Sequence, residues 1–390
     1  MTPYPFTFPA PTDHTPIDPS PTIEPSSPAQ GPQSRTLTYT LENVRGKHPV
    51  PQASHLRTLF QSSRDNSTTI LAFPCTYDGL SSRLVAESGF PLIFLSGFAV
   101  SSAQGLPDTG YIALEDMCHK IQETARVVPP SMPIMVDGDT GYGSPMNVKR
   151  TVECFAAAGA AGVMIEDQTW PKQHTYSALA ALPISIQTIH PSPLTQHRTT
   201  DHPSKSRKGC GHTKGKSTVS RGEAYARIQA AVDARTQGRD IFILARTDAL
   251  IHGWDEAMTR AREFMRLGAD AIFVEALPDR DAMRRCVQEL SGVPLMANII
   301  EGGKTENLSA AELARLGFAA VAYPWTLVAA RLKATREALE GLKRSFGVGS
   351  PPMIMRYDEV CEGVGFRAYW DAETRYEFDE EGLVNPPREE

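Results

Sequence analysis

Residues 241–248 read Ile-Phe-Ile-Leu-Ala-Arg-Thr-Asp, an apolar run that ends in charged residues. Residues 134–139, Ile-Met-Val-Asp-Gly-Asp, and residues 162–167, Gly-Val-Met-Ile-Glu-Asp, follow the same plan. Near-continuous apolar runs of this length are typical of strands that are buried on both faces of a parallel sheet. These segments therefore predict an α/β fold in which charged groups gather at the ends of the strands.

Short apolar runs of the same kind recur along the chain. Helical periodicity near 3.6 residues separates the runs, as in Glu223–Thr236 and Trp254–Leu267, and a glycine follows several of these helices. Eight strands alternating with helices predict a closed (β/α)8 barrel of the TIM type, with a doubly wound open sheet as the alternative. The predicted strands are Thr69–Phe73, Leu92–Leu95, Ile134–Asp137, Gly162–Glu166, Ile241–Arg246, Ala271–Glu275, Pro294–Asn298 and Ala320–Tyr323.

Two terminal segments flank the predicted barrel domain, residues 39–345. The first 35 residues hold ten of the 31 prolines and only four charged side chains, so residues 1–38 are expected to form a disordered tail. A long helix is predicted over Thr326–Ser345, after the last strand. Residues 346–390 are expected to form a C-terminal helical extension.

A third segment, residues 173–208, interrupts the barrel between its fourth and fifth strands. It contains four of the ten histidines, ten serines or threonines, four prolines and no glycine, and it sustains neither helical nor strand periodicity. The histidines follow no metal-ligand spacing. We expect an irregular, exposed insertion, and its abrupt change in composition suggests an intron retained in the gene product.

Composition excludes several classes of function. A net charge of -6, with 45 acidic and 39 basic residues, leaves no basic footprint for nucleic acid. No apolar run approaches the roughly 18 residues of a membrane span. The six cysteines include no CxxC pair, which favours reduced thiols and a cytoplasmic protein. A mitochondrial presequence would be rich in arginine, which the N-terminal tail is not.

The strand ends supply the candidate chemistry, because the active site of such a barrel lies where strands pass into loops. Asp137, Asp139 and Glu166 offer hard oxygen ligands suited to Mg²⁺ or Mn²⁺. The alternative is that these carboxylates pair with Arg246 and Lys172. Arg246 could also form a two-pronged contact with a substrate carboxylate.

A cysteine flanked by glycines follows the insertion, in Lys208-Gly-Cys-Gly-His212. Small neighbours allow a ligand to approach the backbone, and adjacent Lys and His can tune the thiol of Cys210. A zinc site lacks a second ligand pair, and the spacing of nearby glycines does not fit a phosphate-binding loop. The remaining alternative is an inert core cysteine.

An ordered series of motifs resembles the isocitrate lyase and phosphoenolpyruvate mutase superfamily. The similarity is to its short branch, which holds 2-methylisocitrate lyase, 2,3-dimethylmalate lyase, oxaloacetate acetylhydrolase and the phosphonomutases. It covers about residues 40–345 apart from the insertion. The motifs are Ser96-Gly97, Gly105-Leu-Pro-Asp108, Val136-Asp-Gly-Asp-Thr-Gly-Tyr-Gly143, Ile165-Glu-Asp-Gln168, Lys208-Gly-Cys-Gly-His212, Ala245-Arg-Thr-Asp248, Val274-Glu275 and Ala297-Asn298.

The resemblance implies a Mg²⁺-dependent barrel, usually a homotetramer with helix exchange, that acts on a small dicarboxylate. It implies Asp137 and Asp139 as metal ligands, with Glu166 close by. Cys210 would be the general acid on a gating loop and Asp108 would lie near the reacting carbon, while His212 would line the substrate. The substrate-binding set would be Ser96, Gly97, Phe98, Gly211, Arg246, Glu275 and Asn298.

Departures from the family pattern refine the expected function. Residues 173–208 separate Pro171-Lys172 from Gly209-Cys210, which the family keeps together, and Phe94 stands where methylisocitrate lyases often carry Tyr. Tyr323-Pro324 resembles the lyases, whereas the hydrolases typically have Ser. We therefore expect a carbon–carbon lyase acting through an enolate that a cysteine protonates. The alternatives are hydrolysis of oxaloacetate to oxalate and acetate, a phosphonomutase-like activity, or an inactive barrel.

Overall fold

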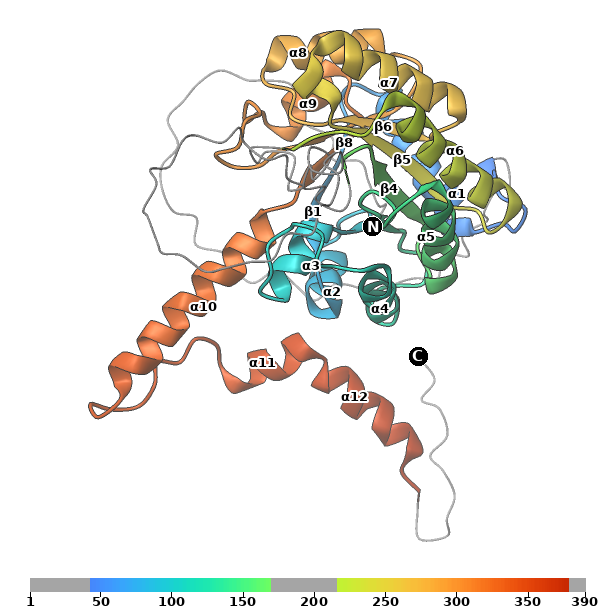
Figure 1. The fold of residues 1–390 in the computed structure, drawn as a ribbon. Coiled ribbons are helices and arrows are strands. Elements are labelled where there is room, and N and C mark those ends of the chain that lie inside the picture. The colour runs from blue at the N-terminus through green and yellow to red at the C-terminus, as the bar shows by residue number, and fades with distance from the viewer. Residues whose placement is uncertain (1–42, 170–215, 379–390) are drawn as a thin grey trace, which may run out of the picture. The chain divides into compact units, whose positions relative to one another are not determined.

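Strands and helices alternate around a closed barrel in the computed structural model, which describes residues 43–169 and 216–378 (Figure 1). All neighbouring strands are parallel, and β1 pairs with β8 to close the ring, with Leu71 opposite Ala320. The predicted barrel is confirmed and the open sheet is excluded. The strands are β1 Leu71–Thr76, β2 Ile93–Leu95, β3 Ile134–Asp137, β4 Gly162–Glu166, β5 Phe242–Thr247, β6 Ala271–Val274, β7 Leu295–Asn298 and β8 Ala320–Tyr323.

Local sequence explains where the surrounding helices begin and end. Pro145 opens α5 directly after Ser144, and Gly159 ends it with a φ of 113° that a side chain would disfavour. Gly268 and Gly317 end two further helices in the same way. The helices of the barrel are α1 Pro51–Arg64, α2 Gly79–Glu87, α3 Gly97–Ala103, α4 Leu114–Ala125, α5 Pro145–Ala158, α6 Arg221–Gln237, α7 Trp254–Leu267, α8 Arg280–Glu289 and α9 Ala310–Leu316.

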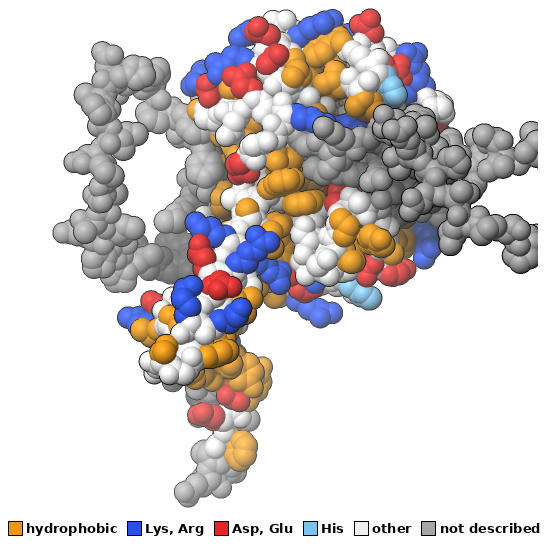
Figure 2. All heavy atoms as spheres, turned by 60° about the vertical axis from the view of Figure 1, so that its left-hand side comes forward, with side chains coloured by type: hydrophobic (Ala, Val, Ile, Leu, Met, Phe, Trp, Pro, Cys, Tyr) orange, Lys and Arg blue, Asp and Glu red, His pale blue; other side chains and the backbone are white. Residues whose placement is uncertain are grey.

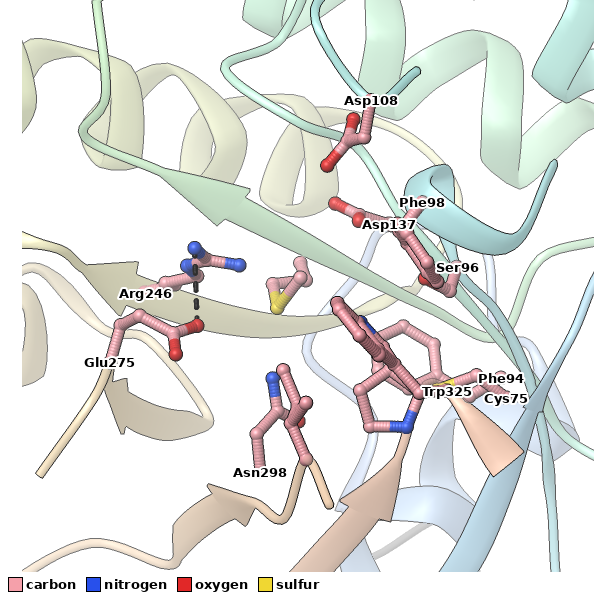
Figure 3. A pocket seen from close by; sticks show the side chains of 13 residues that line it. Cys75, Phe94, Ser96, Phe98, Asp108, Asp137, Arg246, Glu275, Asn298 and Trp325 are labelled. Atoms are coloured by element: carbon pink, nitrogen blue, oxygen red, sulfur yellow. Dashed lines mark ion pairs between the residues drawn. The ribbon is translucent and has the colours of Figure 1, made fainter. Parts of the chain in front are cut away.

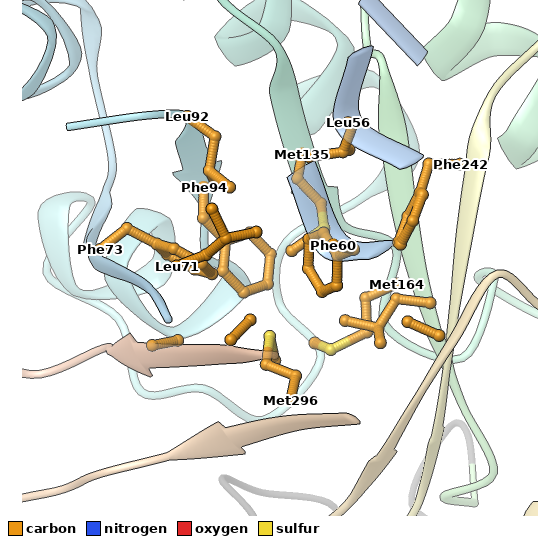
Figure 4. Packing of buried hydrophobic residues seen from close by; sticks show 14 of the residues in the cluster. Leu56, Phe60, Leu71, Phe73, Leu92, Phe94, Met135, Met164, Phe242 and Met296 are labelled. Carbon is orange, nitrogen blue, oxygen red and sulfur yellow. The ribbon is translucent and has the colours of Figure 1, made fainter. Parts of the chain in front are cut away.

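Apolar side chains fill the interior of the barrel (Figure 4). Phe73 and Phe94 meet edge to face at 5.9 Å between ring centroids. Helix α1 adds Leu56 and Phe60 to this core, and the Phe60 ring lies 4.7 Å from that of Phe242. These buried aromatic and aliphatic side chains make the interior of the barrel a packed core.

A network of buried ion pairs, which we call the base network, lies where α1 meets the amino ends of β5 and β6. Arg57 donates two hydrogen bonds to Asp240, at 2.6 and 2.7 Å, and one to Asp270 at 2.9 Å. Arg57 also donates to two backbone carbonyls, while Arg235 and Arg45 add further contacts to Asp270. Every guanidinium nitrogen of Arg57 has a partner in this network, and Arg57 therefore holds α1 against the barrel.

The chain divides into two compact units, residues 1–327 and 328–390, at a point inside α10 (Thr326–Ser345). The second unit continues with α11 (Tyr357–Val364) and α12 (Phe366–Glu373), which confirms the expected helical extension. Many of its large apolar side chains are exposed, among them Phe346, Trp370 and Phe378.

The surface of the molecule mixes charges of both signs. Lys and Arg side chains lie among Asp and Glu on the face shown in Figure 2, in keeping with the small net charge. None of the helices within residues 43–169 and 216–378 combines the length and the apolar character that a membrane crossing requires.

Candidate active site

A cavity opens at the carboxyl ends of the barrel strands. Together with the open solvent at its mouth it spans about 420 Å³, and Arg246, Glu275 and Asn298 lie across it from Ser96 and Asp137 (Figure 3). Most of the strands supply a lining residue, so the site depends on closure of the barrel. The lining residues are Cys75, Phe94, Ser96, Phe98, Asp108, Asp137, Met164, Arg246, Glu275, Asn298, Ile300, Pro324 and Trp325.

Backbone amides fix the carboxylate of Asp137 at the end of β3. One oxygen, Oδ1, accepts from the amide of Asp139 at 3.0 Å, and Oδ2 accepts from the amide of Gly97 at 3.1 Å. A Cβ added to Gly97 would lie 3.1 Å from the same Oδ2, so glycine allows this close approach. Gly97, expected to bind substrate, therefore serves in this structure to orient Asp137.

Negative charge is crowded around Asp137. Removal from water, together with repulsion from Asp139 and Asp108, raises the pKa of Asp137 to about 7 against the opposing effect of Arg246. A carboxylate with so high a pKa at neutral pH is a candidate for a functional group. The crowded carboxylates would also stabilise a cation bound between them.

The loop after β3 is held tightly against β4. The amide of Gly138 donates to the carbonyl of Met164, and the amide of Glu166 donates to the carbonyl of Asp139, both at 2.8 Å. A Cβ on Gly138 would lie 2.8 Å from that Met164 carbonyl oxygen. Asp139 itself has a φ of +52°, a conformation that is uncommon outside glycine. The chain thus accepts backbone strain to place Asp139 here.

Arg246, at the end of β5, is surrounded by carboxylates. Its Nε donates to Asp248 at 2.8 Å and lies 3.4 Å from Glu166, and its Nη2 lies 3.1 Å from Glu275. Among the residues that the structure describes, Nη1 has no hydrogen-bond partner. The guanidinium is buried and oriented, yet one of its nitrogens stays available to an anionic ligand.

The side of the cavity near β8 is largely apolar. The rings of Phe98 and Trp325 stack at 5.3 Å with an interplanar angle of 12°. Trp325 directly follows Pro324, and both line the cavity. The nearby Asn298 has a buried Oδ1 with no hydrogen-bond partner in the described chain. The cavity therefore offers polar groups that could orient a ligand beside an apolar surface that could contact a hydrocarbon part.

The cavity brings together seven of the predicted site residues: Ser96, Phe98, Asp108, Asp137, Arg246, Glu275 and Asn298. Gly97, Asp139 and Glu166 lie immediately behind this lining, in contact with Asp137 or Arg246. The 3.4 Å approach of Glu166 to Arg246 agrees with the alternative in which Glu166 pairs with that arginine. Cys210, Gly211 and His212 lie outside the described residues, as does the predicted insertion.

Metal-ligand geometry is less complete than the sequence suggests. Within residues 43–169 and 216–378, no three His, Cys, Asp or Glu side chains are grouped closely enough to hold a metal ion. Asp137 and Asp139 are adjacent, whereas Glu166 is turned towards Arg246. The three-carboxylate metal set remains a prediction.

Several lining residues were not predicted from the sequence. Cys75 lies inside β1, Met164 lies inside β4, and both look like ordinary core positions in the sequence. Burial and the neighbouring Asp137 raise the pKa of the Cys75 thiol, so it is neutral. Trp325 follows the end of β8, and the rule that strand ends carry the site could have identified it.

The profile of the phosphoenolpyruvate phosphomutase family matches residues 60–190 and 205–343. The chain belongs to this family. Its 14 unmatched residues between the two blocks fall inside the predicted insertion.

Individual relatives point to several chemistries. A probable 2-methylisocitrate lyase of Corynebacterium glutamicum is 35% identical over 274 residues, which cover 69% of this chain and 75% of that protein. A 2,3-dimethylmalate lyase structure is 31% identical with a TM-score of 0.67, covering 82% of this chain and 94% of the other. An oxaloacetate acetylhydrolase structure with 3,3-difluorooxalacetate is 29% identical, also at a TM-score of 0.67, covering 83% and 96%.

A more distant structure is relevant to the metal. It is a phosphonopyruvate hydrolase in complex with oxalate and Mg²⁺, 25% identical with a TM-score of 0.63, covering 83% of this chain and 99% of the other. The chain is therefore a homologue of lyases, mutases and hydrolases that act on small acids.

Proposed function

We propose that the protein is a Mg²⁺-dependent carbon–carbon lyase that cleaves a small 2-hydroxy or 2-oxo dicarboxylate of the methylisocitrate or dimethylmalate type. The observation that carries this proposal is the cavity itself. Acidic groups at Asp137 and an arginine at Arg246 face each other, and the Phe98–Trp325 stack supplies an apolar surface. Such a site suits a substrate with carboxylates and a hydrocarbon branch.

The residues at the end of β3 fit Mg²⁺ by their chemistry. Asp137 and Asp139 are hard oxygen donors on one rigid loop, and a dication would relieve the repulsion that raises the pKa of Asp137. Mg²⁺ in the phosphonopyruvate hydrolase relative supports this proposal. When bound, Mg²⁺ would stabilise the negative charge that develops on a substrate oxygen as the carbon–carbon bond breaks.

The protein's own residues would bind and orient the substrate. Arg246 would donate from Nη1 to a substrate carboxylate, while its other nitrogens remain on Asp248 and Glu275. The amide group of Asn298 would make a second polar contact. Because Arg246 is already fixed by these carboxylates, little rotamer entropy would be lost on binding.

Cleavage next to a carboxylate leaves an enolate, and its carbon must then receive a proton. We propose Cys210 as the general acid that donates this proton, with His212 and Gly211 beside the substrate and Asp108 near the reacting carbon. Cys210→Ser should leave the fold intact and reduce the rate by about 10²-fold or more. A Ser variant that turns over like the wild type would remove Cys210 from the mechanism.

Pro324 favours a lyase over a hydrolase. Among the described lining residues, Ser96 carries the one hydroxyl group, and it accepts a hydrogen bond from the amide of Ala99 as the cap of α3. Pro324 has no donor with which to orient an attacking water. Oxaloacetate hydrolysis remains the second candidate because an acetylhydrolase is among the similar structures.

A substrate panel tests the proposed function. The protein is incubated with 2-methylisocitrate, 2,3-dimethylmalate and oxaloacetate, with and without Mg²⁺, and the release of 2-oxo acid or oxalate is measured. We expect Mg²⁺-dependent release of a 2-oxo acid from an alkylated substrate. Faster release of oxalate from oxaloacetate would instead establish the hydrolase. Activity that survives chelation would contradict the metal assignment.

The insertion is expected to reduce activity. A loop that carries the general acid must close over the substrate, and 36 extra residues at its base should hinder closure. We therefore propose that deletion of residues 173–208 raises the rate of turnover. The gap in the family profile at residues 191–204 supports this hypothesis. An inactive deletion variant, together with transcripts that retain the segment, would overturn it.

The assembly is proposed from the family resemblance, and the location is proposed from the pattern of cysteines. We propose a cytoplasmic homotetramer, and the exposed apolar side chains of residues 328–378 support an association of this kind. Light scattering of the purified protein would give its mass directly, and a monomer at micromolar concentration would contradict the tetramer.

A further inference from the structure

Lys216 is buried against Asp248, behind the cavity rather than in its lining. Its Nζ lies 2.7 Å from Asp248 Oδ1, and the two side chains are 4% and 0% exposed. A buried lysine is expensive unless it is paired, so the position of this charge needs an explanation. Lys216 was not among the candidate site residues predicted from the sequence.

The backbone around Lys216 is fixed by the strand end that carries Glu166. The amide of Thr169 donates to the carbonyl of Ser217 at 3.0 Å, and the amide of Val219 donates to the carbonyl of Asp167 at 2.9 Å. Gln168 and Thr218 form an antiparallel bridge between the same two stretches. The residues that directly follow Lys216 are therefore fixed against the end of β4.

Asp248 connects Lys216 to Arg246. Its Oδ1 accepts from Lys216 and from Arg246 Nη2 at 3.1 Å, and its Oδ2 accepts from Arg246 Nε at 2.8 Å. Burial raises the pKa of Asp248, but Arg246 and Lys216 outweigh this effect and hold that pKa well below its ordinary value. The amide of Asp248 donates to Asp167 at 2.8 Å, which fixes the backbone as well.

The charges near Arg246 show why a second cation is needed. Three carboxylates surround this one guanidinium: Asp248, Glu166 and Glu275. With Arg246 as its sole cation, Asp248 would attract the guanidinium more strongly and leave it less able to bind another anion. Lys216 shares the charge of Asp248, so part of the positive potential of Arg246 remains directed to the cavity.

We propose that Lys216 is a positioning residue: it holds Asp248 so that Arg246 presents Nη1 to a carboxylate of the substrate. This inference rests on the proposed function, in which Arg246 binds that carboxylate. Lys216 acts through Asp248 and does not touch the substrate. Its removal should therefore weaken carboxylate binding more than it slows the chemical step.

Binding of oxalate in the presence of Mg²⁺, measured by calorimetry on the full-length protein, tests the proposal without turnover. Lys216→Met should weaken oxalate binding about ten- to a hundredfold, the scale of a lost hydrogen bond to a charged group. Lys216→Arg retains the charge and should recover most of the affinity. Lys120→Met is the matched control, because Lys120 pairs with Glu123 on α4 away from the cavity. It should bind oxalate like the wild type.

The variants separate this inference from the proposed function. Arg246→Lys should also weaken oxalate binding; if it does and Lys216→Met does not, the role of Lys216 is refuted while that of Arg246 stands. If Arg246→Lys binds like the wild type, the carboxylate-binding role of Arg246 fails and the inference fails with it.

A folding defect would not block the test. If Lys216→Met does not fold, the double variant Lys216→Met with Asp248→Asn removes both charges and should fold, since no buried charge is left unpaired. Its oxalate affinity should still be reduced, because an amide has one acceptor oxygen and cannot hold both Nε and Nη2 of Arg246, and this loss of orientation should outweigh the gain in positive potential. Wild-type affinity in the double variant would overturn the proposal.

Discussion

Two buried charge clusters lie at opposite ends of the same barrel and differ in how completely they are satisfied. In the base network, Arg57 uses all three of its guanidinium nitrogens on Asp240, Asp270 and backbone carbonyls. At the cavity, Arg246 keeps Nη1 without a partner among the described residues. The pKa of Asp137 there is raised to about 7.

This difference separates a stabilising cluster from a functional one. Arg57 has no guanidinium nitrogen left to offer a ligand, and its contribution is to hold α1 against the strands. An incompletely satisfied network stores unfavourable interactions that a metal or substrate would relieve. An unused donor on Arg246 beside a carboxyl group with a raised pKa therefore distinguishes the candidate active site from the base network.

The largest effect is expected from Asp137→Ala. Turnover should fall by at least about 10³-fold because a metal ligand is lost. Without Mg²⁺, the free energy of unfolding should change by less than about 1 kcal/mol, since two lost hydrogen bonds are offset by relief of repulsion. Steady-state rates and urea unfolding measure the two quantities. If the Asp137→Ala variant kept full activity in chelator-treated buffer, Asp137 would be excluded as a metal ligand.

Arg57→Met, in the base network, should lower stability and leave turnover nearly unchanged, the reverse of Asp137→Ala. It leaves Asp240 and Asp270 with fewer partners, so unfolding should become easier by about 3–5 kcal/mol, while the rate per folded molecule is retained. Arg64→Met is the matched control on α1, because Arg64 pairs with the exposed Asp65. It should cost less than about 1 kcal/mol. If Arg57→Met and Arg64→Met lowered the free energy of unfolding equally, the base network would not be the stabilising cluster.

Trp325→Ala should produce an intermediate effect confined to specificity. Loss of the stack on Phe98 should reduce the preference for alkylated over unalkylated malate by about tenfold in kcat/KM, the scale of one or two methylene contacts. Activity on the unbranched substrate should change little. A variant whose preference is unchanged would show that the apolar surface does not contact the substrate.

The smallest effect concerns a surface cluster. Hydrogen bonds from Arg221 and Arg260 lower the pKa of Glu256 from 4.5 to about 2. A carboxyl group with a depressed pKa stabilises the fold above about pH 4.5, and this contribution is lost as the pH falls towards 2. Because Arg221 is exposed to solvent and Arg260 keeps Asp167 as a second carboxylate partner, Glu256→Gln should cost under about 1 kcal/mol at pH 6 and less at pH 3. Urea unfolding at both values checks this sign.

Much of this organisation could be predicted from the sequence, for identifiable reasons. The buried strands are short apolar runs, so Ile134–Asp137, Gly162–Glu166 and Ala320–Tyr323 were predicted with the bounds that the structure has. Strand ends also located Arg246, Glu275 and Asn298. Apolar periodicity and the ends of strands depend on residues that are close together in the sequence, so both can be recognised without a structure.

The remainder depends on contacts between distant residues. Helix α1 was not predicted, because its polar sequence gives a weak apolar pattern and its stability comes from Arg57 and the barrel core. The role of Lys216 depends on Asp248, 32 residues away. Trp325 becomes part of the site only because closure of the barrel places its ring against Phe98, which is far away in the sequence.

The base network also has a consequence for biosynthesis. Arg57 lies 183 residues before Asp240 and 213 residues before Asp270. At about 5–20 residues per second, a ribosome needs roughly 10–40 s to produce the second partner after Arg57 has been made. For most of that interval Arg57 has neither counter-ion, and Leu56 and Phe60 lack the later strands of the core, so the emerging amino-terminal part of the domain is a natural substrate for chaperones.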